Sequence, residues 1–464
     1  MNLDSIIFLS VFLPVCLAIY WLIPGNKGKN IVLLALGLVF YSFGSLSGLA
    51  VLVIAALVNY VVGLILQKEN CPKAVIVLGV AANLLFLAVY KYLDFLLCGV
   101  LGLEQMELGL VAPIGISFFT FKSISYLIDT WRSKENGTKS FFDLLLYISF
   151  FPQIMAGPIT RFREFGPQLS LRKVSVEGAA AGLRRFVVGL AKKLIFAGTL
   201  GKIVDGVFSL DAVQDVRLAW LAAIAYSLQI YFDFSGYSDM AIGLGGVLGF
   251  HTPENFQYPY IAHSVENFWR RWHISLSSWF KDYLYIPLGG NRKGTLRKGL
   301  NKAIVFSLCG IWHGAAWTYI LWGLWHGLLS ALESLSVLLV RKLEKSRGGR
   351  ILGRVYTLLV VCLGFVMFRA TSVSQGFQVI GAMFTGFTFT PQATLLLRKL
   401  LSPEAVAVLL LGIALCLPVK DFLAKKSWYR ILEPISYIAV LVLLVLCIAK
   451  LASGGFAPFI YAQF

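Results

Sequence analysis

The residues best suited to chemistry lie in one polar stretch, Glu266–Gly290, which reads ENFWRRWHISLSSWFKDYLYIPLGG. It places Arg270, Arg271 and His273 in a chain that is otherwise apolar, and a second motif, GIWHGAAW, brings His313 about forty residues later. An imidazole is the side chain most often used to take up and release a proton near neutral pH. The two motifs therefore predict a buried site that handles a polar substrate.

The composition is that of a protein embedded in a membrane. Of the 464 residues, 58% are hydrophobic and only 14% are charged, and the mean hydropathy is +0.77. Many apolar runs reach the length of about 20 residues that a helix needs to cross the hydrocarbon core of a bilayer. The sequence predicts an all-α, polytopic integral membrane protein with roughly ten to twelve transmembrane helices, plus interfacial and re-entrant helices.

The net charge of +18 reflects membrane topology rather than nucleic-acid binding. Lysine and arginine fall in short clusters between apolar runs, as the positive-inside rule places them in cytoplasmic loops. Membrane lipid is therefore an expected partner and nucleic acid is not. The seven cysteines form no CxxC pair and lie mostly inside apolar runs, where a thiol behaves as a small buried hydrophobe. We expect no disulfide framework and no metal site.

The chain reads as a single membrane-embedded domain over residues 1–464. Residues 1–130 hold N-terminal spans, residues 131–334 hold the motifs, and residues 335–464 hold C-terminal spans. The first span has neither a basic leader nor a small-residue cleavage site, so we expect it to remain uncleaved. The apolar runs of the N-terminal region are Ser5–Leu22, Ile31–Tyr41, Gly48–Leu66 and Ala74–Tyr90.

Two segments of the core depart from a plain transmembrane helix. Pro152, Gly157 and Pro158 lie close together, which predicts either a broken, re-entrant segment or a helix that ends in a turn. Between residues 172 and 198, basic side chains alternate with apolar ones at near-helical spacing. This second segment is expected to be an amphipathic helix at the cytoplasmic interface.

A third polar interruption follows the apolar run Leu218–Phe232, in the sequence YFDFSGYSDMAIGLGG. It contains Asp233, Tyr237 and Asp239. Charged residues at membrane depth are costly and are functional by default. An aqueous turn at the membrane interface would explain the same residues without a function, and the sequence does not separate the two interpretations.

The stretch from His273 onward, HISLSSWFKDYLYIPL, is predicted to form an amphipathic helix lying on the membrane. Its arginine neighbours and Lys281 would face water or phosphate, and its aromatic rings suit the headgroup level. A simple interfacial belt is the plainer interpretation, but it does not account for His273, for which we expect a polar, cavity-lining role. The aromatic residues concerned are Trp269, Trp272, Trp279 and Tyr283.

His313 and His326 lie in the long apolar run that follows the basic segment Asn291–Lys302. At 1.5 Å per residue, a helix would place His313 roughly 16 Å beyond Lys302, near the middle of a ~30 Å hydrocarbon core. The run is too long for one straight span, so we expect a break between residues 310 and 316. The two histidines can share a site only if the helix is broken. For each of them, a structural imidazole bonded to a neighbouring carbonyl group is the alternative.

Five segments together resemble the membrane-bound O-acyltransferase superfamily. They are FLSVFLPVCLAIYWLIP, PQIMAGPITRF, YFDFSGYSDMAIGLGGVLGF, ENFWRRWHISLSSWFKDYLYIPLGGNRKG and GIWHGAAWTYILWGLWHGL. More narrowly, they are similar to the bacterial branch that contains the alginate and peptidoglycan O-acetylation membrane subunits. The resemblance extends to about Glu333, and later residues match only in their pattern of spans.

The resemblance implies an O-acyltransferase with a central tunnel, in which a cytoplasmic acyl thioester meets an extracytoplasmic hydroxyl group. His313 falls on the family's WHG motif and would be catalytic, whereas His273 falls on its RRWH motif and would support catalysis or line the donor side. A neutral imidazole at His313 would remove the acceptor's proton and return it to the leaving thiolate. The other residues expected in or near the tunnel are Trp312, Arg270, Arg271, Trp272, Asp233, Tyr237, Asp239, Asp282 and His326.

The resemblance also implies the reaction partners. The donor would be acetyl-CoA or another acyl thioester, with no bound cofactor, and the acceptor would be an extracellular or cell-wall polysaccharide. Because the chain has no serine-hydrolase motif, we expect a separate extracytoplasmic hydrolase-fold partner at the bacterial plasma membrane. Two alternatives stay open: D-alanyl transfer to teichoic acid from an acyl carrier protein and, in another class, a transporter or flippase of lipid-linked glycans.

Overall fold

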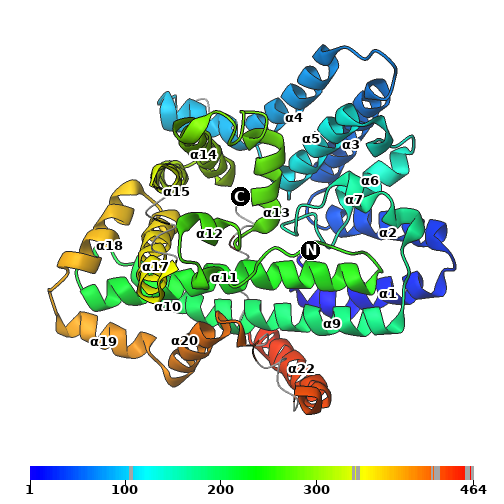
Figure 1. Cartoon of the computed structure of the whole chain (residues 1–464). Helices are drawn as coiled ribbons and strands as arrows, with labels where there is room; N and C mark the ends of the chain where they lie inside the picture. The colour runs from blue at the N-terminus through cyan, green and yellow to red at the C-terminus, as the bar shows by residue number, and fades with distance from the viewer. Residues whose placement is uncertain are drawn as a thin grey trace. The chain divides into compact units, whose positions relative to one another are not determined.

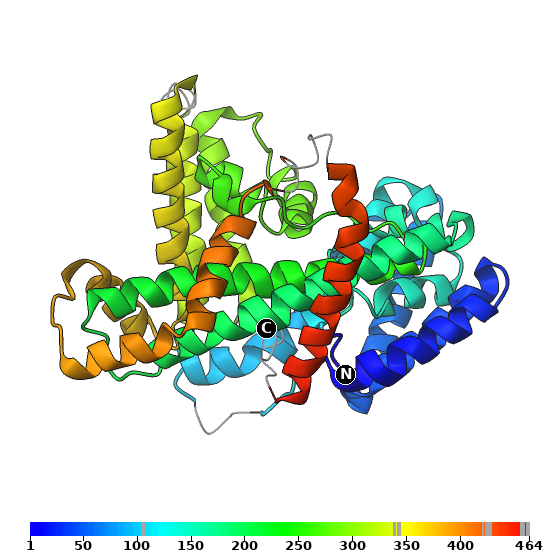
Figure 2. The same cartoon turned by 90° about the horizontal axis from the view of Figure 1, so that it is seen from below.

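The computed structural model describes residues 1–103, 108–336, 340, 345–419, 422, 429–454 and 460. Within this part of the chain the regular structure is helical, which confirms the predicted all-α class. Figure 1 labels the helices, and Figure 2 shows the same chain turned by 90°. The chain divides into two compact units, described separately below. Of the described residues, unit 1 comprises those within 1–186 and 237–253, and unit 2 comprises those within 187–236 and 254–460.

Unit 1 contains the first apolar helices, which agree with the spans predicted from the sequence. The buried helix α5 packs against α3, α4 and α6. The rings of Phe8, Phe12, Phe40 and Phe151 form an aromatic core, in which Phe12 and Phe151 lie 5.5 Å apart. The elements are η1 (Phe8–Phe12), α1 (Leu13–Leu22), α2 (Asn26–Ser42), α3 (Leu46–Leu66), α4 (Lys73–Asp94), η2 (Phe95–Val100), α5 (Ile116–Arg132), η4 (Lys134–Asn136), α6 (Phe141–Ser149), α7 (Phe162–Phe165) and α8 (Gln168–Leu171).

The helix break predicted around Pro152, Gly157 and Pro158 is confirmed. Helix α6 ends at Ser149, and the chain runs through turns until α7 begins at Phe162. Residues 150–160 of this non-helical segment are buried in unit 1. Irregular backbone of this kind is tolerated inside a membrane protein only where surrounding protein or a cavity supplies its hydrogen-bond partners.

Unit 2 contains the two histidine motifs and the C-terminal helices. Helices α9 (Val176–Ala191) and α11 (Val216–Val247) contribute residues to both units. The remaining elements are η5 (Lys192–Ala197), α10 (Gly198–Phe208), η6 (Pro259–Ile261), α12 (Val265–Trp269), α13 (Ile274–Phe280), η7 (Lys281–Tyr285), α14 (Gly294–His313), α15 (Trp317–Leu335), α17 (Arg347–Arg369), α18 (Val373–Thr385), α19 (Pro391–Leu400), α20 (Pro403–Leu415) and α22 (Tyr429–Ala452).

Several described helices are suited to cross a membrane. Four of them are both long and apolar enough, and two shorter apolar helices lie at Phe8–Leu22 and Pro403–Leu415. Apolar side chains such as Leu85 and Ile438 point outward from these helices, at 66% and 65% exposure. Such surfaces are stable when lipid covers them. The four helices are Leu46–Leu66, Lys73–Val100, Arg347–Arg369 and Pro434–Ala452.

Helix α11 runs without interruption from Val216 to Val247 (Figure 1). Asp233, Tyr237 and Asp239 therefore lie within a helix, and the interpretation of this segment as an aqueous turn is wrong. The helix tolerates the two carboxylates because each has a cationic partner, Lys193 for Asp233 and Arg185 for Asp239. A paired charge can be buried where an isolated one cannot.

Helices α14 and α15 form a hairpin, which confirms the break predicted between residues 310 and 316. Helix α14 ends at His313, and α15 begins at Trp317. The two helices cross at Gly310 and Gly323, where a methyl group on Gly310 would lie 2.5 Å from the carbonyl oxygen of Tyr319. Only glycine allows this close approach of the two backbones.

The stretch that follows His273 is helical from Ile274 to Tyr285, as predicted, because α13 continues directly into the π-helical turn η7. The aromatic rings assigned to the headgroup level are instead buried inside unit 2. The exposed fractions of Trp269, Trp272, Trp279 and Tyr283 are 8%, 2%, 7% and 8%. The interfacial-belt interpretation is wrong for these residues, because ring-to-ring packing within the protein removes them from the surface.

Candidate active site

His313 is the last residue of α14 and lies in an aromatic pocket. Its side chain is buried, and its ring centroid lies 4.9 Å from that of Trp312, 5.0 Å from Trp322 and 5.2 Å from Phe368. These rings exclude water from around the imidazole. The carbonyl end of a helix carries partial negative charge, which favours a cation there. The position therefore suits a base that becomes positively charged when it accepts a proton.

His273 occupies the tight turn between α12 and α13. Its backbone is left-handed, with φ 45° and ψ 55°, a conformation that non-glycine residues adopt rarely and often at functional positions. Its ring lies 4.6 Å from Phe234 and 6.3 Å from Trp312. Burial lowers the pKa of His273 to about 3, so the imidazole is neutral at physiological pH. Both motif histidines thus lie beside the ring of Trp312.

His326 joins the same cluster because the hairpin folds α15 back along α14. The ring of Trp322 lies 5.0 Å from His313 and 5.2 Å from His326, so this indole stands next to both imidazoles. Trp269 lies 5.1 Å from His326 on another side. Neither nitrogen of His326 has a hydrogen-bond partner among the described residues, so the carbonyl-bonded alternative is not observed for it there.

The imidazole of His326 fits against the backbone of α17 at Gly364. A methyl group added at Gly364 would lie 2.7 Å from Nε2 of His326 and 3.3 Å from the ring of Trp325. Trp325 is itself fixed, because its indole N–H donates to the carbonyl oxygen of Val360 at 3.0 Å. The absence of a side chain at Gly364 therefore determines where His326 sits.

The substitution Gly364→Ala is expected to displace His326 and to reduce acyl transfer roughly tenfold, because the extra methyl overpacks the site and shifts the neighbouring rings. Gly381 on α18 provides the matched control, since a methyl group there meets nothing within 4 Å. Transfer rates of the two alanine variants at equal expression test the prediction. Equal rates for Gly364→Ala, Gly381→Ala and wild type would contradict it.

The other predicted residues of the His273 motif have distinct surroundings. The side chain of Arg270 is 71% exposed and pairs with Glu266. Arg271 donates to Asn267 Oδ1 at 3.2 Å and to a backbone carbonyl at 3.1 Å, so it fixes local structure. Trp272 stacks on Phe268 at 5.4 Å, and Asp282 lies half-buried in η7.

The acidic residues predicted on α11 are engaged in ion pairs. Asp233 binds Lys193 at 2.6 Å in the interior of unit 2, and its second oxygen accepts from the backbone N–H of Ile460 at 2.8 Å. Asp239 belongs to unit 1, where Arg185 donates to it at 2.8 and 2.9 Å. Tyr237 is buried and also belongs to unit 1.

The sequence alone did not single out several residues that build this site. Trp322 and Phe368 complete the pocket of His313, and Gly364 makes room for His326. Glu333 was noted only as the end of the family resemblance, although one signal was available. No aspartate or glutamate occurs between Tyr283 and Leu332, so Glu333 is the first acidic residue after fifty positions that contain both His313 and His326.

The arrangement is suited to proton transfer at a buried imidazole. Among the described residues, no three His, Cys, Asp or Glu side chains lie close enough together to hold a metal ion. Apolar helices long enough to cross a membrane, together with motif histidines buried in one unit, are the features of an integral membrane protein with a buried polar site. Residues 33–374 match the membrane-bound O-acyltransferase family, and the chain belongs to that family.

Three named relatives narrow the comparison. The chain is 36% identical to a probable alginate O-acetylase of Pseudomonas putida, with all of both chains covered. It is 36% identical to a peptidoglycan O-acetyltransferase of Helicobacter pylori, over 81% of this chain and 78% of the relative. It is 29% identical to a teichoic acid D-alanyltransferase of Bacillus subtilis, over 56% of this chain and 69% of the relative. The chain is therefore an O-acyltransferase.

Proposed function

We propose that this chain is an O-acetyltransferase that moves an acetyl group from acetyl-CoA, or another cytoplasmic thioester, toward hydroxyl groups of an extracellular or cell-wall polysaccharide. The full-length similarity to a probable alginate O-acetylase carries the proposal. The similarity to a peptidoglycan O-acetyltransferase supports the same class of acceptor. The enzyme would act in the bacterial cell membrane, with roughly ten to twelve membrane-crossing helices around a central tunnel.

His313 is the proposed catalytic base. Its imidazole takes the proton of the acceptor hydroxyl as the oxygen attacks the thioester carbonyl carbon. The new C–O bond forms, the C–S bond breaks, and the imidazolium returns the proton to the departing thiolate, so no net proton is consumed. The aromatic pocket and the C-terminal end of α14 support this role, and His273, beside Trp312, is proposed to line the donor side.

A separate extracytoplasmic protein with a hydrolase fold is proposed to complete the transfer to the polymer. The sequence contains no GxSxG nucleophile motif of its own. In this proposal the membrane subunit takes the acyl group from the donor, and the soluble partner supplies the nucleophile that passes it to the polymer. Arg270, whose side chain is 71% exposed, is proposed to face the phosphate groups of the donor at the cytoplasmic side of the site. Arg271 and Trp272 are proposed to support it by holding the local structure.

The direct test is transfer of label from radioactive acetyl-CoA in membranes that contain the chain, compared with membranes that lack it. Label should leave acetyl-CoA only when the chain is present, and it should reach added polysaccharide only when the hydrolase-fold partner is also supplied. Polymer acetylated by the purified chain alone would contradict the need for a partner. Absence of any transfer from acetyl-CoA would contradict the proposed donor.

Transfer of D-alanine to teichoic acid is the second candidate, and the similarity to the Bacillus subtilis enzyme favours it over other reactions. It would require a D-alanyl carrier protein as donor instead of acetyl-CoA. The same membranes supplied with labelled D-alanyl carrier protein separate the two candidates. Movement of lipid-linked glycans without any acyl transfer would instead support the transporter alternative.

A further inference from the structure

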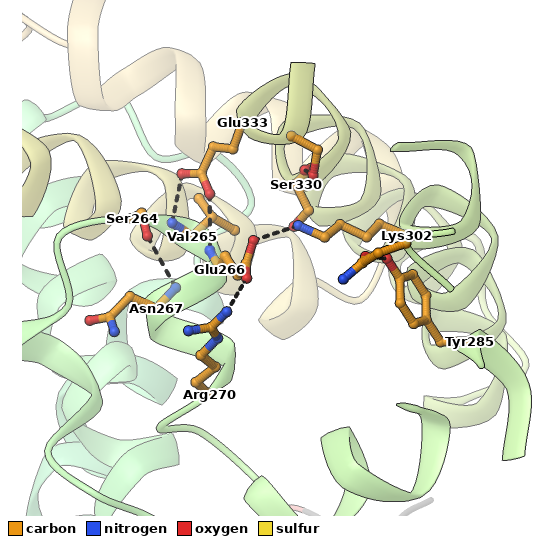
Figure 3. A network of polar contacts seen from close by, with 11 residues as sticks. Ser264, Val265, Glu266, Asn267, Arg270, Tyr285, Lys302, Ser330 and Glu333 are labelled. Carbon is orange, nitrogen blue, oxygen red and sulfur yellow. Dashed lines mark hydrogen bonds and ion pairs between the residues drawn. The ribbon is translucent and has the colours of Figure 1, made fainter. Parts of the chain in front are cut away.

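A polar network in unit 2 joins the short helix that leads to His273 with the helical hairpin that carries His313 (Figure 3). The carboxylate of Glu333, near the end of α15, accepts from two backbone N–H groups at the start of α12. Val265 donates to Oε1 at 2.7 Å, and Glu266 donates to Oε2 at 3.0 Å. The first N–H groups of a helix have no partner within the helix, so outside acceptors must satisfy them.

A second carboxylate extends the network to α14. Glu266 Oε2 accepts from Lys302 Nζ at 2.6 Å, and Oε1 accepts from Arg270 (Figure 3). Burial acts to raise the pKa of Glu266, but the hydrogen bond and charge of Lys302, together with the charges of Arg270 and Lys298, hold that pKa below its ordinary value. Glu266 is therefore ionised at neutral pH, and α12 is tied to both helices of the hairpin.

The bond from Glu333 differs from an ordinary helix cap. Helix caps are usually local, and α12 already has one, because the hydroxyl of Ser264 accepts from the N–H of Asn267 at 3.1 Å. Glu333 is 68 residues away from Val265 in the sequence, and it uses both oxygens. Two charge-assisted hydrogen bonds fix direction as well as distance. The contact thus sets the orientation of α12 relative to α15.

The orientation of α12 also determines the position of His273. The helix ends at Trp269, and the ring of Trp272 stacks on Phe268 of the same helix at an interplanar angle of 20°. His273 follows directly in its left-handed turn and meets Trp312 of α14. A tilt of α12 would therefore move His273 relative to the hairpin.

We propose that Glu333 is a positioning residue for acyl transfer: its carboxylate holds α12 against α15 and so keeps the His273 motif in place relative to the hairpin that carries His313. The inference rests on the proposed function, since the histidines are its proposed reacting site. Glu333 touches no reacting atom in this role. It acts through the two backbone N–H groups that it accepts from and through the turn that follows α12.

The substitution Glu333→Gln in the full-length chain tests this. Glutamine has the same shape, but it replaces one acceptor oxygen with an NH₂ group that faces an N–H donor. We expect kcat with acetyl-CoA to fall roughly 10- to 100-fold while the KM for acetyl-CoA and the thermal unfolding midpoint stay near the wild-type values, because a displacement of about 1 Å is enough to cost that much in rate. Glu333→Asp, which keeps the charge and both oxygens, should recover part of the loss.

Glu404→Gln is the matched control. Glu404 is another glutamate of unit 2, but it is ion-paired with Lys450 at 2.7 Å and lies at the start of α20. The control should retain wild-type kcat. A wild-type kcat in Glu333→Gln would overturn the inference. A lower kcat would also overturn it if the unfolding midpoint falls as well and Glu333→Asp recovers none of the kcat. Neither outcome would affect the proposed function. If membranes that contain the wild-type chain transfer no acyl group from acetyl-CoA, the proposed function and this inference both fail.

Discussion

Membranes that contain His313→Gln are expected to transfer acyl groups about 10²- to 10⁴-fold more slowly than membranes that contain the wild-type chain, which is the usual contribution of a general base. Glutamine fills much of the same space and remains polar, so the pocket formed by Trp312, Trp322 and Phe368 should stay closed. Its amide cannot take up a proton at neutral pH. The loss should therefore appear in kcat rather than in the amount of folded protein.

The measurement is the rate of label release from radioactive acetyl-CoA at matched expression, together with the thermal unfolding midpoint of each purified variant. His251→Gln serves as the control, because His251 is an exposed histidine of unit 1 and receives the identical substitution. That variant should transfer at the wild-type rate. Substantial transfer by His313→Gln would contradict the assignment of His313 as base, and an equal loss in both variants would show that the effect is not specific to the site.

The local features of this site could be predicted because they depend on short stretches of sequence. The excess length of the apolar run around His313 required a break, and the break lies where α14 ends and α15 begins. The sequence could not show that Trp322 would stand beside both His313 and His326, at 5.0 and 5.2 Å. That arrangement depends on where the two helices cross, and the hydrophobic periodicity of a single helix does not predict the crossing point.

The wrong predictions have one physical cause. The aromatic rings were assigned to the headgroup level, and an aqueous turn was one of two open interpretations for the aspartates, because each residue would be stable there alone. In the folded chain, Trp272 is covered by other rings and Asp233 is paired with Lys193, so both are stable in the interior. Partners such as Glu333 for Val265, 68 residues apart, are set by tertiary packing and leave no local pattern.

The buried ion pair Lys193–Asp233 is expected to contribute strongly to the free energy of unfolding. Both side chains are almost completely buried, at 2% and 4% exposure, and their charged atoms lie 2.6 Å apart. Removing one partner of a buried pair leaves the other charge desolvated without compensation, which costs about 3–5 kcal/mol. Asp233→Ala should therefore lower the free energy of unfolding by that amount, and it also removes the acceptor of the Ile460 N–H group.

A double variant distinguishes a buried charge from a simple loss of packing. Lys193→Met combined with Asp233→Leu removes both charges and keeps apolar volume, so most of the stability lost in Asp233→Ala should return. Asp205→Ala is the control, because Asp205 and its partner Arg369 are 69% and 27% exposed, and an exposed pair contributes only about 0–1 kcal/mol. Denaturant unfolding of the purified variants measures all three. A double variant as unstable as Asp233→Ala would show that the pair itself, and not the unpaired Lys193 charge, accounts for the loss. Recovery would instead mean that α11 carries a carboxylate in the interior because Lys193, in the π-helical element η5, supplies its counter-charge.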